Sequence, residues 1–249
     1  MARGWALGLL ACGVAGLVGG CDLFYPSEPL RYRMTVTVDT PDGTRSGSSV
    51  LESTITAGTR FGDASGIRYR MEGEAVAVPL PNGKVLFVLL RSQDIEDPAS
   101  YHANLMQVAA CRNGHPSKTP PPSICEGDNW QEFRNWARNE QLSVELDRSI
   151  YPMVVTFGDI ENPRTVQPVN PNNLEAEMGD DYRIKNIDLQ ITKYPLQHSI
   201  NRLFPNRFWK TWAGEDRKNI AQSDAMKNPY FKSLMGTLNR GDFISEKRQ

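Results

Sequence analysis

Residues 66–90 read GIRYRMEGEAVAVPLPNGKVLFVLL, and this stretch decides the fold class. Ile67 and Tyr69 alternate with arginines, which is the period-2 pattern of a strand with one buried face. Gly73 interrupts this pattern and indicates a bulge. After a turn at PNGK, residues 85–90 are all apolar, as expected of a strand covered on both faces. The stretch predicts antiparallel strands, with the last of them at the centre of a sheet.

Strands of the same kind precede and follow this stretch. Residues 31–39 and 48–56 alternate on either side of the turn TPDGT, which predicts a hairpin. Four strands before residue 91 therefore predict an antiparallel meander. Residues 151–157 and 184–192 alternate in the same way, so strands resume in the second half of the chain.

Helical patterns separate these two groups of strands. Asp97 and Pro98 suit the N-cap and the first position of one helix, and Asp128 precedes a second helix with an apolar face. We expect a single α+β domain over residues 31–249, built on a mainly antiparallel sheet. A helical insertion and further helices would cover one face of the sheet, and residues 195–249 would be helical or irregular.

The N-terminal twenty residues differ from the rest of the chain. Residues 4–20 carry no charge and Arg3 supplies a positive start, as in an export signal. The sequence Val18-Gly19-Gly20-Cys21 resembles the lipobox of bacterial lipoproteins, in which the signal is cleaved before the cysteine and a diacylglycerol is attached to its sulfur. The resemblance implies a signal peptide at 1–20 and a lipid anchor on Cys21. Residues 21–30 are expected to form a short tether, because Pro26 and Pro29 oppose regular structure.

The lipobox resemblance implies that the chain lies in the bacterial cell envelope, facing the periplasm or the cell exterior. Asp22 resembles a signal for retention in the inner membrane, and the choice between inner and outer membrane stays open. The alternative is an uncleaved anchor, because glycines recur at multiples of four, as in transmembrane helix packing: Gly4, Gly8, Gly16 and Gly20.

The body of the chain carries a second resemblance. Segments such as TPDGTRSGSSVLE and GEAVAVPLPNGKVLFVLL, within residues 30–194, are similar to uncharacterised bacterial envelope proteins. This resemblance agrees with an envelope location and implies no activity.

Two cysteines remain if Cys12 leaves with the signal and Cys21 is acylated. Cys111 and Cys125 flank RNGHPSKTPPPSI, a loop whose prolines oppose helix and central strand. In an oxidising compartment this pair predicts a disulfide. Two free thiols, or a metal site that includes His115, are the alternatives, although a fourth ligand and a Cys-x-x-Cys pair are missing.

The sequence carries none of the common catalytic motifs, and 28 Lys and Arg against 29 Asp and Glu argue against nucleic-acid binding. We expect a non-enzymatic envelope protein without metal or cofactor. Its partners would be the membrane, through the anchor, and a ligand or envelope protein that it binds, or its role would be structural. The alternative is an envelope hydrolase with a site around the helical insertion and His102 or His115 as general base.

Three further segments leave alternatives open. Residues 203–212 space their aromatics by four, so these side chains either pack on the core or lie on a membrane surface. The tripeptide RGD at 240–242 is expected to be fortuitous. Six acids either form a solvated surface or offer oxygen ligands to a hard cation: Asp159, Glu161, Glu175, Glu177, Asp180 and Asp181.

Overall fold

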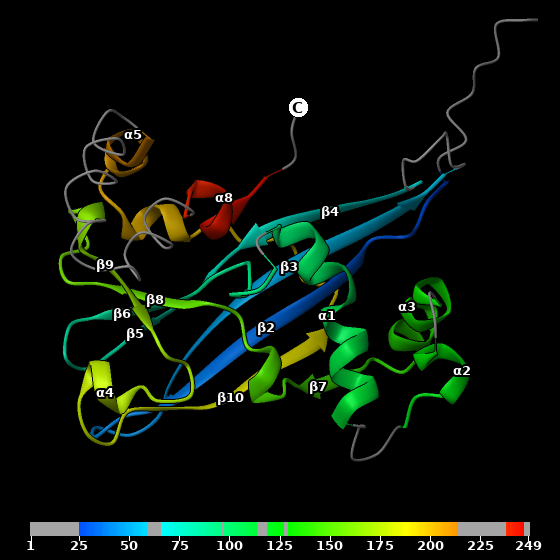
Figure 1. Cartoon of the computed structure of the whole chain (residues 1–249), viewed down its shortest axis with the longest axis horizontal. Coiled ribbons are helices and arrows are strands. Elements are labelled where there is room, and N and C mark those ends of the chain that lie inside the picture. The colour runs from blue at the N-terminus through cyan, green and yellow to red at the C-terminus, as the bar shows by residue number, and fades with distance from the viewer. Residues whose placement is uncertain are drawn as a thin grey trace, which may run out of the picture.

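The computed structural model describes residues 25–58, 66–95, 97–113, 119–126, 129–213 and 238–246. These residues form two antiparallel sheets with helices against them, which confirms the α+β fold class (Figure 1). The predicted cap Asp128 lies outside the described residues. Helix α3 begins two residues later, at Trp130.

The larger sheet has the strand order β11-β4-β3-β2-β10-β7, and β1 pairs with the end of β3. Strands β2 and β3 form the predicted hairpin, with Leu30 opposite Ser53 and Val38 opposite Arg45. Gly43 has φ +95° in the turn between them, a conformation that favours glycine. The strands are β1 (Tyr25–Pro26), β2 (Leu30–Asp39), β3 (Arg45–Ala57), β4 (Ile67–Glu74), β7 (Ser143–Glu145), β10 (Arg183–Ile191) and β11 (Ile244–Ser245).

The smaller sheet has the order β5-β6-β8-β9, with β5 at Val76–Pro79, β6 at Val85–Val88, β8 at Val154–Phe157 and β9 at Val166–Val169. The stretch 66–90 is therefore divided between the two sheets, whereas the sequence predicts one meander. The division falls after Gly73, whose φ is +137°. A Cβ atom there would lie 2.6 Å from Cδ2 of Leu51, so only glycine fits the bend.

The smaller sheet lies directly on the larger one. At Gly47 of β3, a Cβ atom would overlap the carbonyl oxygen of Ala77 in β5, so the two backbones touch at this point. Strand β6 is central in the smaller sheet and buried on both faces, as the sequence predicts: Leu86 and Val88 face the first core, and Phe87 faces the second.

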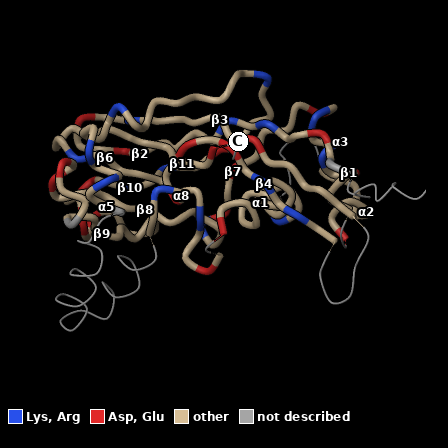
Figure 2. Tube along the Cα trace, turned by 90° about the horizontal axis from the view of Figure 1, so that it is seen from above, with Lys and Arg blue, Asp and Glu red and all other residues tan. Residues whose placement is uncertain are grey.

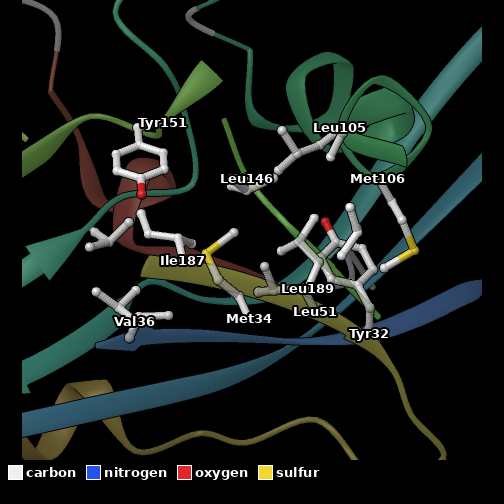
Figure 3. Close-up of a cluster of buried hydrophobic side chains, with 14 of the residues drawn as sticks. Tyr32, Met34, Val36, Leu51, Leu105, Met106, Leu146, Tyr151, Ile187 and Leu189 are labelled. Atoms are coloured by element: carbon white, nitrogen blue, oxygen red, sulfur yellow. The ribbon is translucent and has the colours of Figure 1, made fainter. Parts of the chain in front are cut away.

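The first core lies between the larger sheet and the layer formed by the smaller sheet and the insertion helices. These helices are α1 (Pro98–Asn113), α2 (Pro122–Cys125) and α3 (Trp130–Asn139). Asp97 accepts a hydrogen bond from the backbone N–H of Ser100 at 2.9 Å, which confirms the predicted cap of α1. Figure 3 shows Tyr32 of β2 pointing toward Met106 of α1, and Met34 of β2 pointing toward Leu146. Each large apolar side chain buried in this way stabilises the fold by about 2 kcal/mol.

The second core lies on the other face of the smaller sheet, under the C-terminal segments. Phe204, Phe208 and Trp212 are buried there against Phe87 and Phe157, so residues 203–212 pack on the core. The helical elements after residue 140 are η1 (Arg148–Ile150), η2 (Pro163–Thr165), α4 (Glu175–Met178), η3 (Ile200–Leu203), α5 (Phe208–Ala213) and α8 (Arg240–Phe243).

Helix α8 contains the RGD tripeptide. Asp242 is only 2% exposed, and it accepts a hydrogen bond from the backbone N–H of Asn239 at 2.6 Å and pairs with the buried Arg91 at 3.9 Å. The tripeptide therefore serves the fold, since its acidic side chain closes the helix start and fixes the C-terminal segment to the chain after β6.

The outer face of the larger sheet is crossed by the chain that follows β10. The backbone carbonyl of Tyr194 accepts a hydrogen bond from Arg31. The ring of Tyr194 stacks on Arg33, with the guanidinium carbon 4.6 Å from the ring centroid. Further along, Glu74 of β4 accepts hydrogen bonds from the backbone N–H groups of Ser199 and Ile200 at 2.7 and 3.0 Å. These contacts hold the segment against the sheet as it runs from β2 to β4 and then enters the second core.

Candidate functional site

The predicted lipidation residue, Cys21, lies outside the described residues. Tyr25 and Pro26, expected in the tether, form β1 and pair with Ala57 and Thr56. Strand β3 continues past Ser53, which lies opposite the first residue of β2, and its backbone groups there are available to pair with β1. The backbone N–H of Ser27 then donates to the carbonyl of Ile55 at 2.8 Å. The chain is therefore fixed to the sheet from Tyr25 onward.

Two arginines of α3 hold this entering segment, and we call Arg134, Arg138 and Ser53 the tether clamp. Arg134 is 2% exposed and donates to the carbonyl and hydroxyl oxygens of Ser53 at 2.9 and 2.6 Å, and to the carbonyl of Glu28 at 3.3 Å. Arg138 donates to the carbonyls of Glu28 and Pro29 at 2.5 and 3.1 Å. Carbonyl groups thus take the hydrogen bonds that a carboxylate would usually accept.

Burial, and the nearby positive charge of Arg138, lower the pKa of Arg134 to about 10. The guanidinium therefore remains charged at neutral pH. Arg134 is not among the residues predicted from the sequence, although a signal was present. Arg134 is four residues after Trp130 and three before Ala137, so it lies on the apolar face predicted for this helix.

Cys111 at the end of α1 and Cys125 at the end of α2 form the predicted disulfide, with a Cα–Cα distance of 5.7 Å. Because both sulfurs are bonded, they are not metal ligands in this structure. The third member of the alternative metal set, His115, lies outside the described residues.

Beside the disulfide is a groove of about 370 Å³ between β4, α1 and α3, which we call the disulfide groove. Tyr69 of β4 is 37% exposed there, and Trp130 of α3 is half-buried. The groove is lined by Ile67, Tyr69, Asn104, Gln107, Val108, Cys111, Arg112, Cys125 and Trp130. Its lining combines apolar and aromatic side chains with the polar side chains of Asn104, Gln107 and Arg112, a mixture that suits a binding surface.

A second concavity, of about 390 Å³, brings together four segments that are distant in the sequence; we call it the arginine cleft. Arg112 donates to the hydroxyl of Ser149 at 3.3 Å, and the Tyr101 hydroxyl donates to the carbonyl of Ile150 at 2.8 Å. The lining residues are Ser92, Gln93, Asp94, Ile95, Tyr101, Arg112, Arg148, Ser149, Ile150, Tyr151, Pro152, Asn170, Pro171 and Asn172. Two guanidinium groups and two asparagine amides give it many hydrogen-bond donors.

Asp147 lies beside this cleft. Its carboxylate accepts hydrogen bonds from the hydroxyl and the backbone N–H of Ser149, and these bonds, with the charge of Arg112, lower its pKa. The carboxylate is thus ionised and engaged in fixing η1, so it is poorly suited to accept a proton from a substrate.

The histidine named as a possible general base, His102, lies in the first core and is 1% exposed. Burial lowers its pKa to about 3, a shift that the backbone of Leu90 opposes in part, although Nε2 has no partner in full hydrogen-bond geometry. His102 is thus neutral at physiological pH and closed to substrate. His198 is exposed in the segment that crosses the outer face of the larger sheet.

The six acids considered as cation ligands are all exposed. Across the described ranges, no group of three or more His, Cys, Asp or Glu side chains is placed to hold a metal ion. Basic and acidic residues are interspersed along the described trace (Figure 2).

Among the described helices, none combines the length and the apolar character needed to cross a membrane. Comparisons with protein-family models, with curated proteins and with solved structures find no match to this chain.

Proposed function

We propose that this protein is an exported bacterial lipoprotein, anchored through Cys21, that acts in the cell envelope by binding and without catalysis. The observation that carries the proposal is the Cys111–Cys125 disulfide. Disulfides of this kind persist in oxidising compartments such as the periplasm and are rare in the cytosol. The pairing also accounts for both cysteines outside the N-terminal segment, which leaves Cys21 for acylation.

Binding is favoured over catalysis by the chemistry of the arginine cleft. Its donors converge from separate segments, and among the described residues its lining includes one acid, Asp94, and no histidine. The lining suits a small polar ligand that carries an anionic group, because guanidinium and amide donors can share its charge. The described lining holds no histidine that could act as the general base of a hydrolase, and His102 is enclosed in the core.

The anchoring is tested by labelling the full chain with a radioactive or clickable fatty acid in a bacterial host. Wild-type protein should incorporate the label and fractionate with membranes, and Cys21→Ala should abolish incorporation. Cys12→Ala is the matched control, since it removes the other cysteine of the N-terminal segment and should leave labelling intact. Unchanged labelling and fractionation of the Cys21→Ala variant would overturn the anchoring.

A further inference from the structure

The disulfide groove lies at the end of the larger sheet where the chain enters. Tyr25 of β1 is opposite Ala57 of β3, and Ala57 is opposite Ile67 of β4. These residues form one row across the sheet. Ile67 also lines the groove, so the entry point of the chain and the groove share the same end of the molecule.

The chain between this row and the anchor residue is short. Cys21 precedes Tyr25 by four residues, and four extended residues span at most about 14 Å. From Tyr25 onward the backbone is held by β3 and by the tether clamp, where Arg134 is buried and bonded to both the entering segment and Ser53. A lipid on Cys21 would therefore keep this end of the sheet close to the bilayer.

The side chains at this end suit the surface of a membrane. Tyr69 and Trp130 each combine an apolar ring with a polar group, and such rings concentrate at the level of lipid headgroups. Ile67 and Val108 add apolar surface.

We propose that the disulfide groove and the adjoining part of β4 rest on the lipid bilayer, so that the protein has a fixed orientation on the membrane. The inference rests on the proposed anchoring at Cys21. The tether clamp holds the entering segment on the body of the protein, so that the anchor also fixes the orientation of the body. A flexible connection would let the molecule rotate on the membrane.

Tryptophan quenching tests this orientation. The lipidated protein, purified from membranes in detergent, is reconstituted into phosphatidylcholine vesicles with or without acyl chains brominated near the headgroup. Brominated lipid should quench part of the wild-type fluorescence, and Trp130→Phe should remove more than half of the quenched component. The matched control is Trp209→Phe, which should leave that component unchanged, because α5 and α3 lie at opposite ends of the described molecule (Figure 1).

A second pair of variants keeps the test independent of the Trp130 substitution. Tyr69→Glu places a charge on the exposed rim of the groove and should lower the quenching of Trp130 at least twofold, with the protein still floating with the vesicles. Tyr194→Glu makes the same change on the outer face of the larger sheet and should leave the quenching unchanged.

The outcomes separate the two claims. Vesicle-bound protein whose Trp130 shows no quenching would overturn the orientation and leave the groove to a protein partner, with the anchor intact. Protein that does not float with vesicles would overturn the anchoring and, with it, the orientation.

Discussion

The hydroxyl oxygen of Tyr32 lies 2.6 Å from Nδ1 of His102, and both side chains are buried in the first core. Burial raises the pKa of Tyr32 and lowers that of His102, so both groups are neutral at physiological pH. A protonated hydroxyl can donate to Nδ1, which joins β2 to α1 through one buried hydrogen bond. The histidine considered as a general base is thus a structural link.

This link predicts that the protein loses stability in acid. The pKa of His102 is about 3 in the folded state and 6.5 in its ordinary, unfolded state. Below that ordinary value the unfolded chain binds a proton that the folded chain does not. The free energy of unfolding should therefore fall as the pH drops from 6.5 toward 3, by up to about 1 kcal/mol per pH unit from this residue.

Urea unfolding at a series of pH values measures this slope. His102→Gln should flatten it, whereas His198→Gln, at an exposed site, should leave it unchanged. Equal slopes in the wild type and the His102 variant would show that another group sets the pH dependence.

Reduction of the disulfide should weaken the packing of α1 against α2. For a sequence separation of 14, a disulfide constrains the unfolded chain by on the order of 3 kcal/mol. We expect the double variant Cys111→Ser and Cys125→Ser to lower the free energy of unfolding by this amount in urea titrations, and a reductant to have no further effect on it. Cys21→Ser is the control and should leave stability unchanged, with its full response to reductant retained.

A methyl group at Gly47 should disrupt the contact between the sheets. The Cβ atom would overlap the Ala77 carbonyl oxygen, and two strands would have to separate to admit it. We expect Gly47→Ala to cost several kcal/mol, on the order of 3 or more. Gly158→Ala is the matched control, because its nearest neighbour, Cβ of Thr165, would lie 3.5 Å away, and thermal unfolding should show little change. Similar melting temperatures for both variants would contradict the close approach of β3 and β5.

The arginine cleft should bind a polyanion. Citrate is the probe, and the ionic strength is held constant. In general, a ligand at 100 times its dissociation constant stabilises the protein that it binds by about 2.7 kcal/mol. We expect the melting temperature of the wild type to rise with citrate and that of Arg148→Gln to rise much less. Arg45→Gln removes the same charge from an exposed site on β3 and should respond as the wild type does. An equal response of all three proteins would assign the effect to general ion binding.

The alternation in residues 31–39 and 48–56 was sufficient to predict β2 and β3, because period 2 follows directly from one buried face. The division of residues 66–90 between two sheets could not be predicted in this way. The division depends on two close contacts, of Gly73 with Leu51 and of Gly47 with Ala77. No local sequence pattern connects these positions.

The sites show the same limit. The Cys111–Cys125 disulfide could be predicted from the proline-rich loop that the two cysteines flank, because the chain has few other cysteines. The arginine cleft could not be predicted, because Arg112, Arg148 and Asn170 meet only once the two sheets and the insertion are in place. Arg134 could have been found, since a charged residue within an apolar helical face needs buried acceptors.

Phe243 lies in the second core with its ring centroid 5.9 Å from that of Phe87, and the next residue, Ile244, pairs with Glu74 of β4. Synthesis of β4 and β6 therefore precedes by a long interval the arrival of the residues that cover them. If the chain crosses a membrane in an extended state, the aromatic face of the smaller sheet stays only partly covered, by Phe204, Phe208 and Trp212, until residues 240–245 have emerged. During such an interval a nascent chain is exposed to aggregation and to chaperones.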